Sequence, residues 1–310
     1  MAGLTAAVEL HRAGHAVLVV DKGRGVGGRL ASRRIGEATC DHGAQFITGK
    51  EPRFAAALAE WAEAGVVEEW YRNRDDENPR WRGKPAMTAI AKHLGRDLNL
   101  VVGERLEALR GDADGWIGSG GGRDVVCAGA ALLTPPVPQS LALLDAGGVS
   151  LPGDARAKLA AIEYEPCLAV MAVLDGPSGI PAPGGMAPAE GPMAWIADNQ
   201  AKGVSRRPAV TIHATAAFSR EHWDRDRKET GGMLLQAAAA WLSSRPTEFQ
   251  VHGWLYSTPR RVAESRCLVL NQRPPLLMAG DAFGGPGIEG AALSGWAAAE
   301  TLQSMDLDSA

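Results

Sequence analysis

An apolar run that ends in an acid and enters a glycine-rich basic loop constrains the fold of this chain most strongly. Residues Ala16 to Val20 are continuously apolar, and Asp21 follows them directly. A short run of this kind predicts a strand that is buried on both faces of a parallel sheet. In a dinucleotide-binding fold, an acidic residue at the end of such a strand accepts hydrogen bonds from ribose hydroxyls.

The loop after this strand combines glycine with basic side chains. Its members are Lys22, Gly23, Arg24, Gly25, Gly27, Gly28 and Arg29. Glycine lets backbone N–H groups approach a phosphate, and arginine supplies a planar fork of donors for its oxygens. A flexible basic loop after an ordinary strand is the alternative interpretation. The order of strand, acid, glycines and arginine favours a cofactor site.

The segment before the strand contains only part of the expected motif. A dinucleotide-binding unit opens with a strand and a Gly-x-Gly-x-x-Gly turn. Here an amphipathic helix over residues 1–14 comes first, and Gly3 stands where the third glycine of that turn would be. Either the start is misassigned or truncated, or the protein has lost part of its cofactor cradle. We expect the former because the downstream motifs are intact.

Two further stretches predict cofactor contacts. In the segment Asp41 to Phe46, Gly43 and Ala44 would let the backbone pass close to a flat ring, and Gln45 could reach a polar edge of that ring. A turn into a strand is the alternative there. Near the C-terminus, an apolar strand ends in Gly280-Asp281 and leads through a glycine-rich loop into a helix of small residues. The N-terminus of that helix would face the pyrimidine edge of a flavin.

Composition excludes several classes of protein. The net charge is -4, which argues against bulk nucleic-acid binding. No apolar run approaches membrane-spanning length, and the N-terminus lacks a signal-peptide pattern. The four cysteines are isolated from one another, so they form no metal signature and are expected to be reduced thiols in a cytoplasmic protein.

The motifs together resemble those of the bacterial renalases, which are FAD-dependent oxidoreductases related to the amine oxidases. The resemblance spans nearly the whole chain, and its flavin motifs are shared by a wide superfamily. The more specific segments are Trp195 to Lys202 and His252 to Tyr256. The other matching segments are Asp21 to Leu30, Asp41 to Phe46, Thr134 to Pro136, His213-Ala214, and Gly280 through Gly295.

The resemblance implies an α/β fold of the p-hydroxybenzoate hydroxylase type that binds FAD noncovalently. We expect a Rossmann-type FAD-binding domain, apparently without its first strand, over residues 1–49, 86–136 and 265–310. A smaller α+β substrate domain is expected over residues 50–85 and 137–264. Within it, we expect a helix over residues 52–71, a polar loop at 80–85 and a helix N-cap at Ser219.

The resemblance also implies a reaction. Renalase-like enzymes oxidise 2- or 6-dihydro isomers of NAD(P)H by hydride transfer to flavin N5, and O2 then reoxidises the flavin to give H2O2. The expected partners are therefore a small dihydropyridine nucleotide and O2, in a monomer or homodimer. An amine oxidase or desaturase on the same scaffold is the main alternative. A truncated, non-enzymatic binding protein is the second.

The expected site residues fall into two sets, and no catalytic residue is assigned because the flavin carries the chemistry. Two kinds of substrate candidate listed below have an alternative interpretation. The aromatic residues could pack in the core, and Lys202 could be a solvated surface residue. The expected cofactor-binding residues are Gly3, Asp21, Lys22, Arg24, Gly27, Gly28, Arg29, His42, Gly43, Ala44, Gln45, Phe46, Leu106, Gly280, Asp281, Glu289, Gly290 and Ala291. The substrate candidates are Trp195, Asn199, Lys202, His213, His252, Trp254 and Tyr256.

Overall fold

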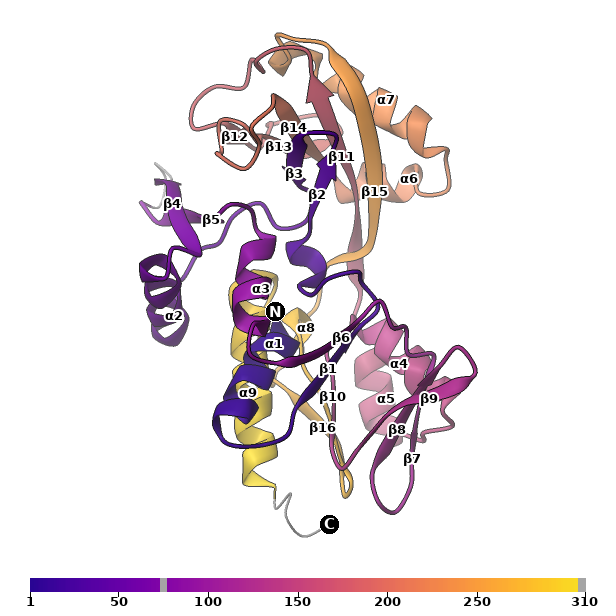
Figure 1. Cartoon of the computed structure of the whole chain (residues 1–310). Helices are drawn as coiled ribbons and strands as arrows, with labels where there is room; N and C mark the ends of the chain where they lie inside the picture. Colours follow the sequence, from indigo (N-terminus) through magenta and orange to yellow (C-terminus); the bar gives the residue numbers. More distant parts are fainter. Residues whose placement is uncertain (73–76, 306–310) are drawn as a thin grey trace. The chain divides into compact units, whose positions relative to one another are not determined.

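A computed structural model describes residues 1–72 and 77–305 (Figure 1). The chain forms two compact units of similar length. Unit 1 comprises Met1–Gly28, Ala91–Tyr164 and Thr258–Ala310, and unit 2 comprises Arg29–Ile90 and Glu165–Ser257. The expected mixed α/β class with a Rossmann-like domain is confirmed. The second unit is not the smaller of the two, contrary to expectation.

Unit 1 contains two parallel strand pairs, as expected of a Rossmann-type domain. Strand β1 (Leu18–Asp21) pairs in parallel with β6 (Asn99–Val102). Strand β10 (Ala131–Leu133) pairs in parallel with β17 (Pro275–Met278), and β16 (Leu268–Gln272) pairs antiparallel to β17. These pairs form two separate sheets. Strand β1 is not buried on both faces as expected, because Leu18 is 38% exposed.

Two helices of unit 1 lie side by side, namely α1 (Ala2–Arg12) and α9 (Gly287–Ser304) (Figure 1). A Cβ at Gly295 of α9 would lie 2.2 Å from the Ala2 carbonyl oxygen, so the close approach depends on glycine. Apolar residues of both helices pack with Leu277 of β17. This packing holds α1 against the sheet. No side-chain hydrogen bond caps the N-terminus of α1.

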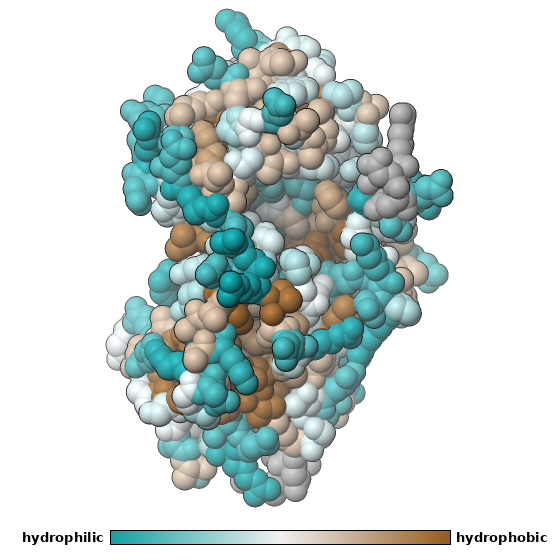
Figure 2. All heavy atoms as spheres, turned by 180° about the vertical axis from the view of Figure 1, so that it is seen from behind, coloured by the Kyte–Doolittle hydropathy of each residue, from teal (hydrophilic) through white to brown (hydrophobic). Residues whose placement is uncertain are grey.

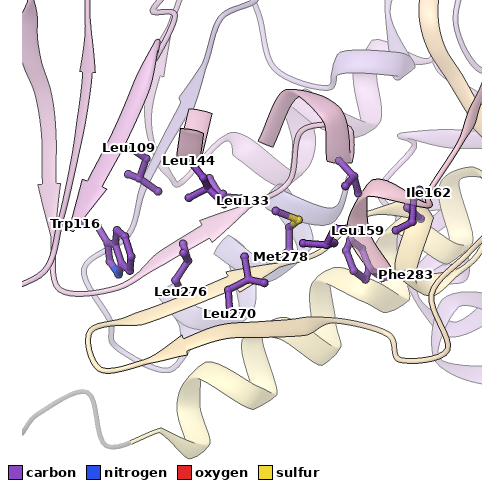
Figure 3. Close-up of a cluster of buried hydrophobic side chains, with 12 residues drawn as sticks. Leu109, Trp116, Leu133, Leu144, Leu159, Ile162, Leu270, Leu276, Met278 and Phe283 are labelled. Atoms are coloured by element: carbon purple, nitrogen blue, oxygen red, sulfur yellow. The ribbon is translucent and has the colours of Figure 1, made fainter. Parts of the chain in front are cut away.

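A second part of unit 1 has its own apolar core (Figure 3). The helices of this core are α4 (Val137–Ala146), α5 (Gly153–Ala160) and α8 (Asp281–Gly284). They pack with β17 and with an antiparallel sheet. The strands of that sheet are β7 (Ala108–Gly111), β8 (Trp116–Gly120) and β9 (Arg123–Ala128). Leu144, Leu159 and Leu276 are buried in this core. Residues 137–164 therefore belong to unit 1, and the chain does not leave it at Pro136 as the expected boundary has it.

Unit 2 is built on a five-stranded sheet in the order β12-β13-β14-β11-β15. One face packs on α6 (Ala216–Glu221) and α7 (Arg227–Ala237) through a core that includes Ile212 and Leu234. The strands are β12 (Gly185–Met186), β13 (Met193–Asp198), β14 (Ala209–Ala214), β11 (Tyr164–Leu174) and β15 (Pro246–Pro259).

The other face of this sheet packs against the hairpin of β2 (Ser32–Ile35) and β3 (Ala38–Asp41). Met171 and Ala209 of the sheet form a buried cluster with Ile35, Ala38 and Cys40 of the hairpin. Residues 29–49 thus lie in unit 2, whereas the expected boundary placed them with the cofactor domain.

The expected helix over residues 52–71 is half helix and half strand. Helix α2 (Pro52–Glu63) ends at a turn in which Gly65 has φ of +69°, and β4 (Val67–Arg72) follows. The segment expected to be a polar loop is β5 (Pro79–Gly83), which pairs antiparallel with β4, and its Arg80 and Arg82 are buried. Helix α3 (Thr88–Gly95) follows as expected.

The helix caps in unit 2 also differ from expectation. Thr215 caps α6 by accepting from the Phe218 N–H, and Asp226 caps α7 by accepting from the N–H groups of Lys228 and Glu229. Ser219 lies inside α6, where its hydroxyl donates to the Thr215 carbonyl and accepts from the Leu168 N–H. It joins the helix to β11 and caps nothing.

Hydrophilic side chains cover much of the face shown in Figure 2, interrupted by small apolar patches. The large apolar residues that are exposed in the described chain are Leu18, Val102, Met233, Leu255 and Val262. Among the described residues, no helix has both the length and the apolar character needed to cross a bilayer.

Candidate functional site

The carboxylate of Asp21 organises the glycine-rich loop of unit 1. One of its oxygens accepts from the Gly23 N–H at 2.7 Å, and the Gly23 carbonyl accepts from Gly103 at 2.7 Å. The Lys22 ammonium donates to Gln139 at 3.4 Å, and Arg24 is exposed. Asp21, which the sequence predicts as a ribose ligand, therefore holds the first turn of the loop.

The glycines of this loop leave its surface open. A Cβ at Gly25 or at Gly28 would meet no described atom within 4 Å, so packing inside the protein does not require glycine there. Gly27 and Gly28 have φ values of +115° and +52°, which favour glycine at both positions. The accessible backbone fits the close approach of a phosphate.

The carboxyl ends of β10 and β17 bring three further predicted positions together. The Ala279 N–H donates to the Leu133 carbonyl at 3.0 Å, so Gly280 and Thr134 follow at the same edge of the sheet. A Cβ at Gly3 would lie 2.9 Å from Thr134 Oγ1. Gly3 thus allows close packing between α1 and the end of a strand, as the third glycine of a dinucleotide turn does.

The predicted residues after Gly280 lie where the chain turns tightly into α8 and then α9. Asp281 is buried in the first turn of α8, and the Gly280 N–H donates to Ser294 Oγ at 2.8 Å. A Cβ at Gly290 would lie 1.9 Å from the Gly285 carbonyl oxygen, so this glycine is required by the backbone itself. Glu289 and Ala291 lie in the first turns of α9. Leu106, the remaining predicted residue, packs against Gly118 of β8.

In unit 2, the segment after β3 is held against residues 29–31. The Ala44 N–H donates to the Arg29 carbonyl at 2.8 Å, and the His42 N–H donates to the Ala31 carbonyl at 3.1 Å. A Cβ at Gly43 would lie 2.0 Å from the Arg29 carbonyl oxygen, which excludes any other residue there. The Gln45 amide donates to the carbonyls of Asp41 and Gly43 at 2.7 and 3.1 Å, which orients its Oε1 away from them.

Asp41 is the centre of a buried polar network. Its carboxylate accepts from Lys202 Nζ at 2.8 Å, from Ser32 Oγ at 2.5 Å and from the Met87 N–H at 3.0 Å. Both members of the ion pair have side chains that are 0% exposed. Burial lowers the pKa of Lys202, and the Asp41 carboxylate acts in the opposite direction. The surface position considered for Lys202 is therefore wrong.

Asn199 belongs to the same network. Its Oδ1 accepts from the Asp41 N–H at 3.1 Å, and its Nδ2 donates to Thr211 Oγ1 at 2.9 Å. Thr211 in turn donates to the Asp41 carbonyl at 2.9 Å. Asn199 and Lys202 were substrate candidates, but their polar groups bind protein atoms, so they support the 41–46 segment.

Four predicted residues come together beside that segment, and we call them the ring cluster: His42, His213, His252 and Trp254. The His42 ring is stacked on Trp254 with centroids 5.4 Å apart and lies edge-on to His252 at 5.0 Å. The His42 carbonyl accepts from Trp254 Nε1 at 2.8 Å and from His213 Nε2 at 3.1 Å. Because a carbonyl only accepts, His213 carries a proton on Nε2.

The histidines of the ring cluster are uncharged at neutral pH. Burial lowers the pKa of His42 to about 3, and repulsion from Arg33 and, when it is protonated, from His252 acts in the same direction. Burial likewise lowers the pKa of His213 to about 4, and the pKa of His252 also lies below its usual value. The cluster thus offers neutral rings.

A second group of aromatic residues, which we call the aromatic group, contains Phe46, Trp70 and Trp195. The ring centroids of Phe46 and Trp195 lie 5.3 Å apart, and those of Trp70 and Trp195 lie 6.5 Å apart. Lys202 Nζ lies 5.2 Å from the Trp70 centroid, and the Arg80 guanidinium lies 5.4 Å from the Phe46 centroid. Protein cations therefore already lie over two of these rings.

Sequence reasoning missed Trp70 and Arg80, which fall in the segments expected to be helix and loop. The run Val66 to Tyr71 is rich in β-branched and aromatic residues, which is a strand signal that could have found Trp70. Tyr256 follows Trp254 by two residues on β15, so strand alternation places it on the same face of the sheet.

Three buried polar atoms around these rings have no hydrogen-bond partner within the described part of the chain: His42 Nδ1, Gln45 Oε1 and Trp195 Nε1. Buried polar atoms are nearly always bonded in folded proteins, so these three atoms are candidates for contact with a ligand or an ordered water. The same described residues contain no cluster of three or more His, Cys, Asp or Glu side chains that could hold a metal ion.

Comparison with known proteins agrees with the dinucleotide-binding character of unit 1. A family model described as an NAD(P)-binding Rossmann-like domain matches residues 1–61. Putrescine oxidase, in a structure from a redesign of its cofactor binding, is 15% identical with a TM-score of 0.69, over 98% of this chain and 97% of that chain.

Two further solved structures have similar folds. A Pyrococcus furiosus protein is 14% identical with a TM-score of 0.64, over 98% of this chain and 95% of its own. An oxidoreductase from Methanosarcina mazei is 10% identical with a TM-score of 0.62, over 97% and 98%. At these identities the likeness shows the fold.

Proposed function

We propose that this protein is an FAD-dependent oxidoreductase that oxidises dihydropyridine nucleotides. Its Rossmann-like fold and its structural likeness to oxidoreductases support the class of enzyme. FAD fits the residues present, because the glycine loop after Asp21 has an open backbone and because His42 Nδ1 and Gln45 Oε1 have no partner among the residues that the structure describes. The candidate cofactor residues of unit 1 are Asp21, Gly27, Gly28 and Asp281, and those of unit 2 are Arg29 and Gly43 to Gln45.

The positive charge beside the ring cluster supports an anionic nucleotide, and not a protonated amine, as the substrate. Arg33 lies 3.4 Å from the His252 ring, and Arg80 lies over the Phe46 ring of the aromatic group. The Asp41 carboxylate of this region is already paired with Lys202. A protonated amine would meet the positive charge of Arg33 at the ring cluster, and the Asp41 carboxylate would not be free to bind it. An anionic nucleotide would be attracted to that positive charge.

The chemistry of a dihydropyridine agrees with neutral histidines. FAD supplies the hydride acceptor when it is bound. The substrate ring needs no proton removed, since its own nitrogen lone pair expels the hydride. His42 and Trp254 would contact the substrate ring and exclude water from it, and the Asp41 network would hold the segment 41–46 in place. No side chain of the ring cluster is required as a base.

The test is anaerobic stopped-flow spectroscopy of the FAD-loaded protein. We expect 2- or 6-dihydro-NAD(P) to bleach the oxidised flavin band within seconds, and admission of O2 to restore the band with formation of H2O2. Ordinary 4-dihydro-NAD(P)H is the matched control, and we expect it to bleach the band far more slowly. No bleaching by any dihydropyridine would contradict the proposal.

An amine oxidase is the second candidate, because putrescine oxidase is among the structural neighbours. Bleaching by putrescine or another amine, without bleaching by dihydro-NAD(P), would favour it. A non-enzymatic binding protein is the third. Purified protein that stays colourless after incubation with FAD would favour that possibility, whereas a yellow protein would exclude it.

A further inference from the structure

The guanidinium group of Arg33 on β2 fixes where the His252 ring carries its hydrogen. Arg33 Nη2 lies 3.4 Å from His252 Nδ1, and Arg33 Nη1 donates to Gln250 Oε1 at 3.5 Å. A guanidinium has five N–H groups and no acceptor atom, so it can only donate in both contacts. His252 Nδ1 therefore accepts with its lone pair, and the one ring hydrogen of a neutral imidazole lies on Nε2.

The surroundings of His252 keep its ring neutral. Burial lowers the pKa of His252, and the charges of Arg33 and Arg227 act in the same direction. The titratable ring of His42 faces it with centroids 5.0 Å apart, and the pKa of His42 is itself about 3. A protonated His252 would carry a hydrogen on Nδ1 and would repel the Arg33 donor. The contact with Arg33 therefore selects one charge state and one tautomer.

The resulting Nε2–H group of His252 is an open donor beside the ring cluster. Within the described part of the chain, Nε2 has no hydrogen-bond partner, and it is not one of the buried polar atoms without a partner, so a ligand can reach it. The His252 ring lies edge-on to Trp254, with centroids 4.2 Å apart, and edge-on to His42. Under the proposed function, those two rings contact the substrate ring.

A dihydropyridine nucleotide has one acceptor next to its ring that matches this donor. Its ring nitrogen carries the ribose, so the carboxamide is the hydrogen-bonding group nearest to the ring. The lone pair of the ring nitrogen is delocalised toward the carboxamide oxygen, which makes that oxygen a better acceptor in the dihydro form than in the oxidised product. Arg33 in turn polarises the imidazole toward donation, because hydrogen bonds in a chain strengthen one another.

We infer that Arg33 is a positioning residue that holds His252 as a neutral Nε2–H donor, and that His252 binds the carboxamide oxygen of the dihydropyridine substrate. The identity of the ligand rests on the proposed function. His252 then selects substrates that have an acceptor at this place beside the ring. It moves no proton, because the substrate ring needs none removed.

The first test observes the tautomer in the FAD-loaded protein. Long-range proton–nitrogen NMR of protein with isotope-labelled histidine tells protonated from unprotonated ring nitrogens, and His252→Phe identifies the His252 signals by their loss. We expect Nε2–H in the wild type, a mixture of tautomers in Arg33→Gln, and Nε2–H restored in Arg33→Lys, which keeps a charged donor. Arg34→Gln, at an exposed neighbouring position, is the matched control. The same tautomer in wild type and Arg33→Gln would refute the role of Arg33.

The second test separates recognition of the oxygen from general contact with the ring. Isothermal titration calorimetry on the FAD-loaded protein compares NAD+ with its thionicotinamide and acetylpyridine analogues. Sulfur is a weak acceptor, whereas the acetylpyridine keeps the oxygen and lacks the amide N–H groups. We expect wild type to bind the thio analogue about tenfold more weakly than the other two, and His252→Phe to bind all three equally. No binding of NAD+, equal affinities in wild type, or a thio penalty that persists in His252→Phe would each overturn the oxygen contact.

The two proposals can fail separately. An Arg33-dependent tautomer and a His252-dependent thio penalty in a protein that does not oxidise dihydro-NAD(P) would refute the proposed function and keep the donor. An active oxidase whose KM for dihydro-NAD(P) is the same in wild type, Arg33→Gln and His252→Phe would keep the function and refute the donor.

Discussion

The ion pair of Asp41 and Lys202 is the residue-scale feature on which the 41–46 segment depends. We expect Lys202→Met to lower the free energy of unfolding by about 3–5 kcal/mol, because it leaves a buried carboxylate without its cation. The double variant Asp41→Asn with Lys202→Met should recover part of that loss, since no charge then remains buried. Urea unfolding followed by tryptophan fluorescence measures both.

The matched control is an exposed pair, Lys158 and Asp154, whose side chains are each 76% exposed. Lys158→Met should leave the unfolding midpoint nearly unchanged, because exposed pairs contribute little. If Lys202→Met were as well tolerated as Lys158→Met, the buried network would not hold the segment.

His42 makes stability depend on pH. Its pKa is about 3 in the folded protein and about 6.5 in an unfolded chain. Below pH 6.5 the unfolded chain binds a proton that the folded protein does not, so folded stability falls as pH is lowered toward 3. The loss between pH 7 and pH 5 should be about 2 kcal/mol for this residue.

His42→Leu should remove that part of the pH dependence. Urea unfolding at pH 7 and at pH 5 measures it, with His11→Gln on the exposed surface of α1 as the control. An equal fall in stability for wild type and His42→Leu would show that His42 does not contribute to the dependence.

At the scale of elements, we expect replacement by alanine to have opposite effects on stability at two helix glycines. Gly295→Ala in α9 should destabilise the protein by about 1–3 kcal/mol, because the new Cβ would meet the Ala2 carbonyl of α1. Gly232→Ala in α7 has open space around the new methyl group. It should stabilise by about 0.5–1 kcal/mol through helix propensity. Thermal unfolding of both variants decides this, and a stabilising Gly295→Ala would disprove the tight contact between α1 and α9.

At the scale of the whole molecule, candidate cofactor residues occur in both units. We expect Asp281→Ala in unit 1 and Arg29→Ala in unit 2 each to weaken FAD retention about tenfold, since each removes a charged or polar contact. Each variant should also show a smaller rise in melting temperature on adding FAD. Flavin absorbance per protein after gel filtration measures retention, with the exposed Arg34→Ala as the control. Unchanged flavin content in both variants would contradict the cofactor placement.

Much of unit 1 could be predicted because its signals are local. The run from Ala16 to Asp21, the glycines after it and the Gly280-Asp281 turn each lie within a few neighbouring residues. The helix α1 and the parallel pairing of β1 followed from periodicity and from the order of elements. Local patterns failed in residues 64–72 and 79–83, where the turn at Gly65 and the pairing of β4 with β5 override an apparent helix.

The sequence by itself determined the class of fold, the acid and glycines of the loop after β1, and the residue types of the ring cluster. Only the tertiary structure decided which charges are buried. Lys202 is an ordinary lysine in the sequence until Asp41, 161 residues away, neutralises it in the core. Local propensity acts over a few residues, whereas desolvation and charge pairing depend on groups that folding brings together.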